Sequence, residues 1–266
     1  MSAASLYILI QLFIYHMPLS MLIYHPIMLV LCRSCSNILV KTWSQQEEDM
    51  DNSKDTRRSC VDCAAGACDG KSGSYPDFCI TSEILKGGTA ADLASETIDK
   101  YLNDPEDSLI AKASAEVEFE NYCKATRVEE ICEFARKIGA KKLGIATCVG
   151  LLKEARTAAA IFRKHGFEVY GAACKAGAVR KTDIGLDSAQ ESLGPHICNP
   201  ILQAKLLNEQ KTDLNIVIGL CVGHDSLFYK YSDALCTTLV TKDRVLGHNP
   251  AAALYQADGY YSRLLK

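Results

Sequence analysis

Hydrophobic and polar positions divide the chain into parts with different patterns. Residues 6–31 are almost entirely apolar and contain no Asp, Glu, Lys or Arg. Residues 51–89 are rich in Gly, Ser, Asp and Cys and show no helical or strand periodicity, which indicates a loop. We therefore expect a hydrophobic extension over 1–49, a cysteine-rich segment over 50–89, a helical arm over 90–140 and an α/β domain over 141–266.

The expected helical arm carries clear start signals. An amphipathic helix is predicted over residues 90–102, and Pro105 suits the first turn of a second helix that runs to about residue 121. Thr126 and Glu129 have the spacing of a capping box, which predicts a third helix to about residue 138.

Apolar strands alternate with helical runs in the last part of the chain. Strands are predicted over 143–147, 167–173, 214–220 and 235–241. Helices are predicted over about 151–165, 200–208, from 225 onward, and over 251–264. This alternation predicts an α/β fold, a Rossmann-like three-layer architecture with a parallel sheet of about four strands.

Composition narrows the function classes. Lys and Arg total 29 and Asp and Glu total 32, so the net charge of −3 excludes the strongly basic footprint of a nucleic-acid-binding protein. The chain has no G-x-G-x-x-G after the first predicted strand, no G-x-x-x-x-G-K-[ST] and no G-x-S-x-G. The chain therefore lacks the usual phosphate-binding loops of nucleotide-binding proteins. It also lacks the nucleophile elbow of serine hydrolases.

Two interpretations fit the apolar stretch 6–31. It is long enough to span a bilayer, and Arg33 and Lys41 follow it with no basic residue before it, which would leave the body of the chain cytoplasmic. Pro18 and Pro26 disturb a helix, however, and favour an extension that is not part of the working protein. In both cases we expect a cytoplasmic globular body, with a single membrane anchor in the first.

Thirteen cysteines are the most unusual feature of the composition. Four of them follow the spacing C-x2-C-x4-C-x10-C in the cysteine-rich segment: Cys60, Cys63, Cys68 and Cys79. Four thiolates in a glycine-rich loop suit a tetrahedral zinc ion or an iron–sulfur cluster, and the spacing does not choose between them. Free thiols or disulfides are the alternative, and a reducing cytoplasm disfavours the disulfides.

A second group of cysteines stands where ligands bind in parallel sheets. Cys148, Cys174 and Cys221 each end a predicted strand, and Cys198 immediately precedes a predicted helix start at Asn199. Because strand ends of a parallel sheet meet at one edge, these thiols are expected to converge on one crevice. Two further cysteines, Cys132 and Cys236, are interpreted as core residues.

Polar side chains follow the same strand ends. Lys175 follows Cys174, and His224 comes three residues after Cys221. A cation beside a thiol favours the thiolate, and an imidazole can act as a base or a metal ligand. The candidates for catalytic roles are Cys148, Cys174, Cys221, His224 and Lys175.

The chain resembles a known family, the predicted metal-binding proteins of the domain of unknown function number eighteen-forty-seven. The resembling segments are the cysteine cluster from Cys60 and residues 121–130, 143–151, 198–200, 219–226 and 242–250. The resemblance covers about residues 58–266 and implies metal binding without an established reaction. The extension 1–49 departs from the family pattern.

These observations lead to a metal-binding protein as the main hypothesis. We expect one metal centre, either a zinc ion or an iron–sulfur cluster, at the cysteine cluster. A second site is expected at the sheet edge, with His224 and the following thiols: Cys123, Cys148, Cys174, Cys198 and Cys221. Redox or thiol chemistry suits that second site if it is catalytic, with an unidentified small molecule or redox partner. The alternatives are a carrier or sensor without turnover, and a membrane-tethered interaction protein with a structural zinc.

Overall fold

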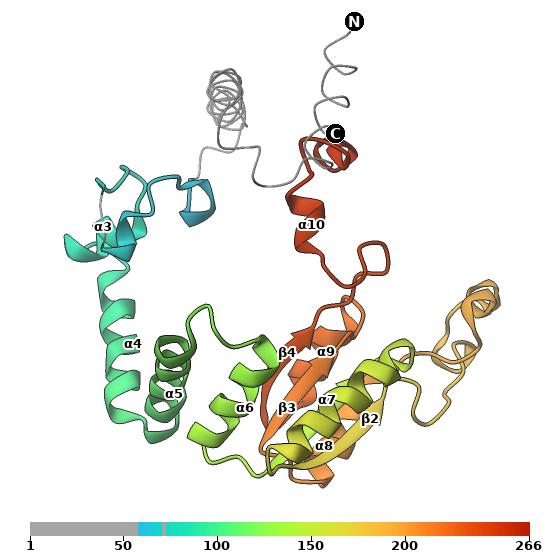
Figure 1. The fold of residues 1–266 in the computed structure, drawn as a ribbon. Coiled ribbons are helices and arrows are strands. Elements are labelled where there is room, and N and C mark those ends of the chain that lie inside the picture. Colours follow the sequence, from blue (N-terminus) through green and yellow to red (C-terminus); the bar gives the residue numbers. More distant parts are fainter. Residues whose placement is uncertain (1–57, 71–72) are drawn as a thin grey trace, which may run out of the picture. The chain divides into compact units, whose positions relative to one another are not determined.

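The computed structural model describes residues 58–70 and 73–266 (Figure 1). The chain separates into two units, the first ending at Glu96 and the second running from Thr97 to Lys266. The predicted membrane segment or extension, residues 6–31, lies outside the described residues. Within the part that is described, no helix is both long enough and apolar enough to cross a bilayer.

The described part of the first unit, residues 58–70 and 73–96, contains two short helical turns, a short helix and the start of a longer one. The turns η2 (Cys60–Asp62) and η3 (Ala67–Asp69) carry the first cysteines, and α3 spans Ile80–Leu85. Helix α4 (Ala91–Asn103) begins in this unit. The predicted loop over 51–89 therefore missed α3, because six residues are too few to display helical periodicity.

The helical arm of the second unit follows the predicted start signals. Helix α5 spans Pro105–Asn121, and the side chain of Asp104 accepts hydrogen bonds from the first free N–H groups of that helix. Helix α6 (Arg127–Lys137) begins with the predicted capping box, in which the Glu129 carboxylate accepts from the backbone N–H of Thr126 at 2.7 Å. Lys137 on α6 pairs with two glutamates of α5, which joins the two helices.

Four apolar segments pair into one parallel sheet. The strands are β1 (Lys142–Thr147), β2 (Glu168–Ala173), β3 (Leu214–Ile218) and β4 (Leu235–Val240). Their spatial order is β2-β1-β3-β4, and every pairing is parallel. The predicted α/β fold with a Rossmann-like parallel sheet is confirmed.

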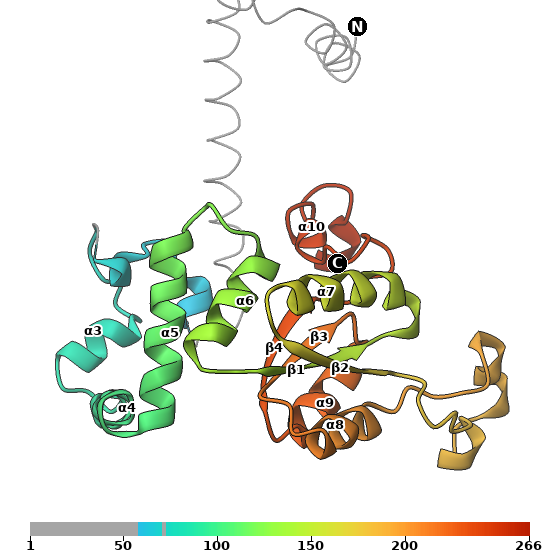
Figure 2. The same ribbon diagram turned by 60° about the horizontal axis from the view of Figure 1, so that its bottom comes forward.

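Helices cover both faces of the sheet (Figure 2). Helix α7 (Leu152–Lys164) lies on one face, and α8 (Pro200–Glu209) and α9 (His224–Tyr231) lie on the other. Phe162 of α7 and Phe228 of α9 are fully buried against the central strands. Strand β3 is buried at every position, as expected for a central strand that is covered twice.

The strand order places a topological switch point between β1 and β3. From β1 the chain passes to β2, then returns across β1 to form β3 and continues to β4. The helices that follow β1 and β3 therefore leave toward opposite faces of the sheet. In folds of this kind, ligands generally bind beyond the carboxyl ends of the strands at such a switch point.

The end of the chain differs from its prediction. A helix over 251–264 was expected, but α10 spans only Ala251–Leu254 and is followed by turns and by η7 (Ser262–Leu265). The backbone N–H of Gly259 binds the carbonyl of Gln256, three residues earlier, so the chain makes a turn there. Gly259 lies within the predicted range, and because glycine is a poor helix former it disfavours a helix that continues through this turn.

Candidate functional site

The ends of β1 and β2 bring two thiols side by side. Thr147 and Ala173 are the last paired residues of these strands, and Cys148 and Cys174 directly follow them. The N–H of Cys174 donates to the carbonyl of Thr147 at 2.8 Å, which continues the pairing by one residue. The two cysteines thus occupy equivalent positions on neighbouring strands.

The turn after β3 supplies a thiol and an imidazole. Gly219 has a φ of 65°, and an added Cβ there would lie 1.9 Å from a methyl carbon of Leu151, so this position requires glycine. The N–H of His224 donates to the carbonyl of Cys221 at 2.9 Å. This turn brings His224, the first residue of α9, close to Cys221, which follows the end of β3.

Cys198 reaches the site from the start of α8. The side chain of Asn199 caps this helix by accepting from the N–H of Leu202 at 3.0 Å. The N–H of Asn199 also donates to the carbonyl of Cys174 at 2.7 Å, which fixes the helix start against the end of β2. The predicted meeting of a helix start with the strand ends is therefore present in the structure.

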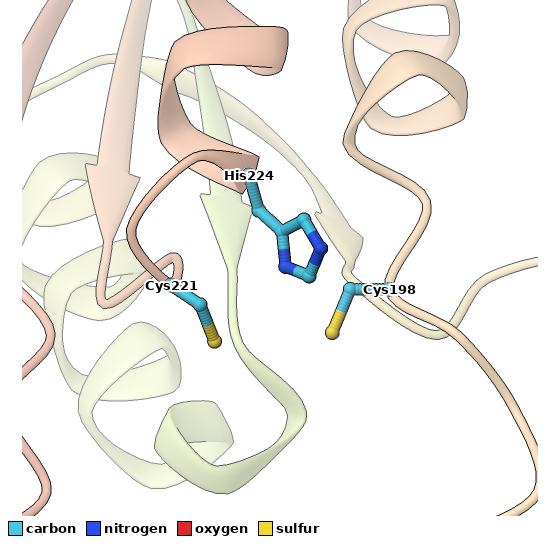
Figure 3. A group of neighbouring side chains, drawn as sticks. All are labelled: Cys198, Cys221 and His224. Atoms are coloured by element: carbon cyan, nitrogen blue, oxygen red, sulfur yellow. The ribbon is translucent and has the colours of Figure 1, made fainter. Parts of the chain in front are cut away.

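Cys198, Cys221 and His224 form a compact donor group (Figure 3). Their ligand atoms all lie within 4.8 Å of one another, and all three residues are half-buried. Across residues 58–70 and 73–266 this is the one such group of three or more His, Cys, Asp or Glu residues. The Nδ1 atom of His224 is buried and has no hydrogen-bond partner.

Three sulfurs share hydrogen bonds beside this group. The thiol of Cys174 bonds both Cys148 and Cys198, which lowers the pKa of each of these two to about 5. The same two bonds, together with burial, raise the pKa of Cys174 strongly. Of the three sulfurs, Cys174 is thus the one whose surroundings favour the protonated form.

Backbone N–H groups also point at these sulfurs. The N–H of Val149 donates to Cys174 Sγ and the N–H of Gly150 donates to Cys148 Sγ, each at 3.4 Å. Both groups belong to the turn η4 (Val149–Leu151), which begins immediately after Cys148. The turn thus fixes the direction of both side chains and favours their ionised forms.

The loop after β4 aims two cations at the site. Asp243 orders this loop by accepting from two backbone N–H groups, those of Val245 at 2.9 Å and Leu246 at 2.8 Å. Arg244 Nη2 donates to Cys221 Sγ at 2.9 Å, and Lys242 bonds Cys148 and helps to lower its pKa. Sequence reasoning did not single out Lys242, because β4 and β1 are not adjacent in sequence.

The remaining predicted residues have different surroundings. Lys175 donates to the carbonyl of His196, and its charge lowers the pKa of Cys198. Cys123 stands exposed in the turn after α5 with a φ of 57°, and the structure does not bring it into the donor group.

Cys132 is fully buried in the core, as predicted. Cys236 is half-buried and packs against the core from β4.

Gln203 supports the site and was missed at the sequence level. Its side-chain amide is fully buried and donates to the carbonyls of Thr147 at 3.1 Å and Ala172 at 2.7 Å. Both carbonyls belong to the strand ends that carry the thiol pair. The sequence did carry a signal for this role. Gln203 is a polar residue on the apolar face of a predicted helix, next to Ala204 and one turn before Leu207.

The cysteine cluster of the first unit gathers around a cavity of its own. Cys60, Cys63, Cys68 and Cys79 all line a cavity of about 140 Å³. Gly66 and Gly70, with φ values of 59° and 75°, turn the backbone on either side of η3. The four sulfurs share this cavity, but they do not form a group within metal-ligand distance of one another among the described residues.

Comparison with known proteins places the chain among relatives without an assigned activity. Residues 86–239 match a family described as protein of unknown function, DUF1847. These residues include the donor group at the sheet edge and exclude the cysteine cluster of the first unit. An uncharacterized protein of Methanocaldococcus jannaschii, MJ0455, is 46% identical over 188 residues, which are 71% of this chain and 93% of the relative.

Proposed function

The chain belongs to the DUF1847 family, and from this premise we propose that it binds a thiophilic metal ion through Cys198, Cys221 and His224. The observation that carries the proposal is the buried Nδ1 of His224, which has no partner and stands beside two sulfurs. A buried polar atom left without a partner costs about 1–3 kcal/mol. A metal ion at this position would provide the missing partner.

The donor set favours zinc over an iron–sulfur cluster at this position. Two thiolates and one imidazole are a common zinc ligand set, whereas [2Fe–2S] and [4Fe–4S] clusters typically take four thiolates. Three protein ligands are also typical of zinc sites that keep one position open for a small molecule. Zinc bound there would supply Lewis-acid chemistry, which polarises an oxygen atom of a ligand.

The surrounding residues prepare these ligands. Arg244 donates to Cys221 Sγ at 2.9 Å and holds this sulfur in place beside the other two donors. Cys174 and the charge of Lys175 lower the pKa of Cys198, which favours the thiolate that a metal requires. Enzymatic turnover and reversible metal carriage or sensing would both use this site, and zinc dependence of a reaction would separate them.

The cavity of the first unit is a second candidate metal site. Four cysteines line it, and the loop that carries them has one buried apolar residue, Ala67, among residues 58–70. A metal ion would draw the four thiolates together and supply the folding energy that a small core cannot. Four thiolates suit either a zinc ion or an iron–sulfur cluster at this site.

Metal analysis of the protein purified without oxygen tests the proposal. We expect stoichiometric zinc without visible absorption at the sheet-edge site, and loss of one zinc in the His224→Ala variant. His165→Ala is the matched control, because His165 is exposed and contacts Arg136 on the surface. Unchanged metal content in His224→Ala would contradict the sheet-edge site. A brown protein that loses its colour in the same variant would show that the sheet-edge site holds an iron–sulfur cluster and not zinc.

A further inference from the structure

We infer that Cys148 and Cys174 form a redox-active dithiol that closes to a disulfide when it reduces hydrogen peroxide. The pair lies beside the proposed metal ligands and includes none of them. The inference therefore goes beyond metal binding, and either proposal can fail without the other.

The backbone spacing of the pair suits a disulfide. Cys148 and Cys174 continue the register of two paired parallel strands, whose last partners are Thr147 and Ala173. Strands in a sheet lie about 4.8 Å apart. Disulfides join residues whose Cα atoms lie about 4.4–6.8 Å apart, so closure needs no large backbone movement.

The two sulfurs are already held toward each other. The thiol of Cys174 bonds the sulfur of Cys148. Separate backbone N–H groups hold each sulfur from the turn η4, those of Val149 and Gly150. Gln203 fixes the strand ends immediately before both cysteines. Such fixed neighbouring thiols have little conformational entropy to lose when a bond forms between them.

The surroundings assign different roles to the two thiols. Cys148 is 9% exposed and bonds Lys242, whereas Cys174 is 2% exposed. Cys148 is therefore the sulfur that an oxidant reaches, and Cys174 is the thiol that resolves the intermediate. Because both side chains are largely covered, a small hydroperoxide fits this position better than a protein disulfide.

The reaction balances with hydrogen peroxide as oxidant. The Cys148 thiolate attacks one peroxide oxygen, the O–O bond breaks, and a sulfenic acid and a hydroxide form. The hydroxide takes the proton of Cys174 to become water. The Cys174 thiolate then attacks the Cys148 sulfur, the S–O bond breaks, and a disulfide and a second hydroxide result. An external small dithiol reduces the disulfide and restores the pair.

Cys198 is the competing partner for Cys174. Its sulfur also shares a hydrogen bond with Cys174, but it comes from a helix start rather than a paired strand. A Cys174–Cys198 disulfide would also remove a proposed metal ligand. The two pairings therefore differ in a measurable way, because only the Cys148–Cys174 bond leaves the zinc in place.

Peptide mapping of the oxidised full-length protein tests the inference. The reduced, zinc-loaded protein is treated with one equivalent of hydrogen peroxide, digested without reductant and analysed by mass spectrometry, with zinc measured in parallel. We expect a peptide pair joined through Cys148 and Cys174, full reversal by dithiothreitol, and retained zinc. A Cys174–Cys198 linkage with zinc loss, or no linkage of Cys174, would overturn the inference.

Variants separate the two roles. Cys174→Ser should accumulate a sulfenic acid on Cys148, which dimedone traps, and Cys148→Ser should yield no linked pair. Cys132→Ser is the matched control, because this thiol is fully buried in the core and should leave the linkage unchanged. Dimedone labelling of Cys174 rather than Cys148 in the wild type would contradict the assigned order. A linked pair in a protein that holds no zinc would instead refute the metal proposal alone.

Discussion

The buried side-chain amide of Gln203 donates a 3.1 Å hydrogen bond to the backbone carbonyl of Thr147, the last residue of β1. The same amide nitrogen also bonds the carbonyl of Ala172, one residue before the end of β2. A single side chain from α8 therefore braces the two strand ends from which the thiol pair projects.

Gln203→Leu should lower the free energy of unfolding by about 1–3 kcal/mol, because it removes two buried hydrogen bonds to the strand carbonyls. Gln210→Leu is the control, since Gln210 closes the same helix and makes one partly buried contact with Lys142. Urea unfolding of both variants checks the prediction. Equal midpoints for the two variants would show that the Gln203 amide does not brace the strands.

Gly144→Ala should destabilise the sheet by about 1–3 kcal/mol through overpacking. An added Cβ at this position would lie 2.0 Å from Oδ1 of Asn215, which is buried and hydrogen-bonded on the neighbouring strand. Gly171→Ala on β2 is the matched control, because its nearest neighbour would be 3.6 Å away. Thermal unfolding should separate the two variants, and a Gly144→Ala protein as stable as the control would contradict this packing.

Alkylation of Cys148 should be nearly independent of pH above about pH 6 in the reduced, metal-free protein. The hydrogen bond from Cys174 lowers the pKa of Cys148 to about 5, so the thiolate is lost only as the pH falls through that value. Burial raises the pKa of Cys236, whose labelling should increase only at high pH. Iodoacetamide labelling between pH 4 and pH 10, read by peptide mass spectrometry, measures both profiles. A rise of Cys148 labelling through pH 8–9 would contradict the thiolate assignment.

Arg244→Met should weaken zinc binding at the sheet edge by about tenfold, because groups that hold a metal ligand contribute roughly this much to affinity. Arg244 donates to Cys221 Sγ at 2.9 Å, and methionine keeps length but removes the charge. Competition with a chromophoric chelator measures the affinity. Arg180→Met, which breaks a surface ion pair with Glu191, should not change it. Equal zinc affinities in the two variants would show that Arg244 does not contribute to the metal site.

Cys60→Ser should lower the metal content of the first unit and increase protease cleavage within residues 58–89. The loop has little core, so its order should depend on the metal that the four thiols hold. Limited proteolysis with metal analysis checks both effects, and zinc bound by the sheet-edge group should be retained. Unchanged cleavage and metal content would show that the four cysteines do not form a metal site.

Local patterns in the sequence determined the elements of this protein. Alternating apolar strands and helical runs predicted all four strands, and the capping box at Thr126 and the proline at 105 predicted two helix starts. These signals act within a few residues, because caps and periodicity are properties of one segment. The same reasoning placed Cys148, Cys174 and Cys221 at strand ends and Cys198 at a helix start.

Tertiary structure alone decided which of these ends are neighbours. The order β2-β1-β3-β4 puts the switch point between β1 and β3, and no local pattern specifies on which side of β1 a strand will pair. It also brought Gln203 and Lys242 to the thiols and left Cys123 outside the donor group. Contacts between residues tens of positions apart depend on how hydrophobic faces pack, so the donor group and the thiol pair form only when the sheet and its helices close around one core.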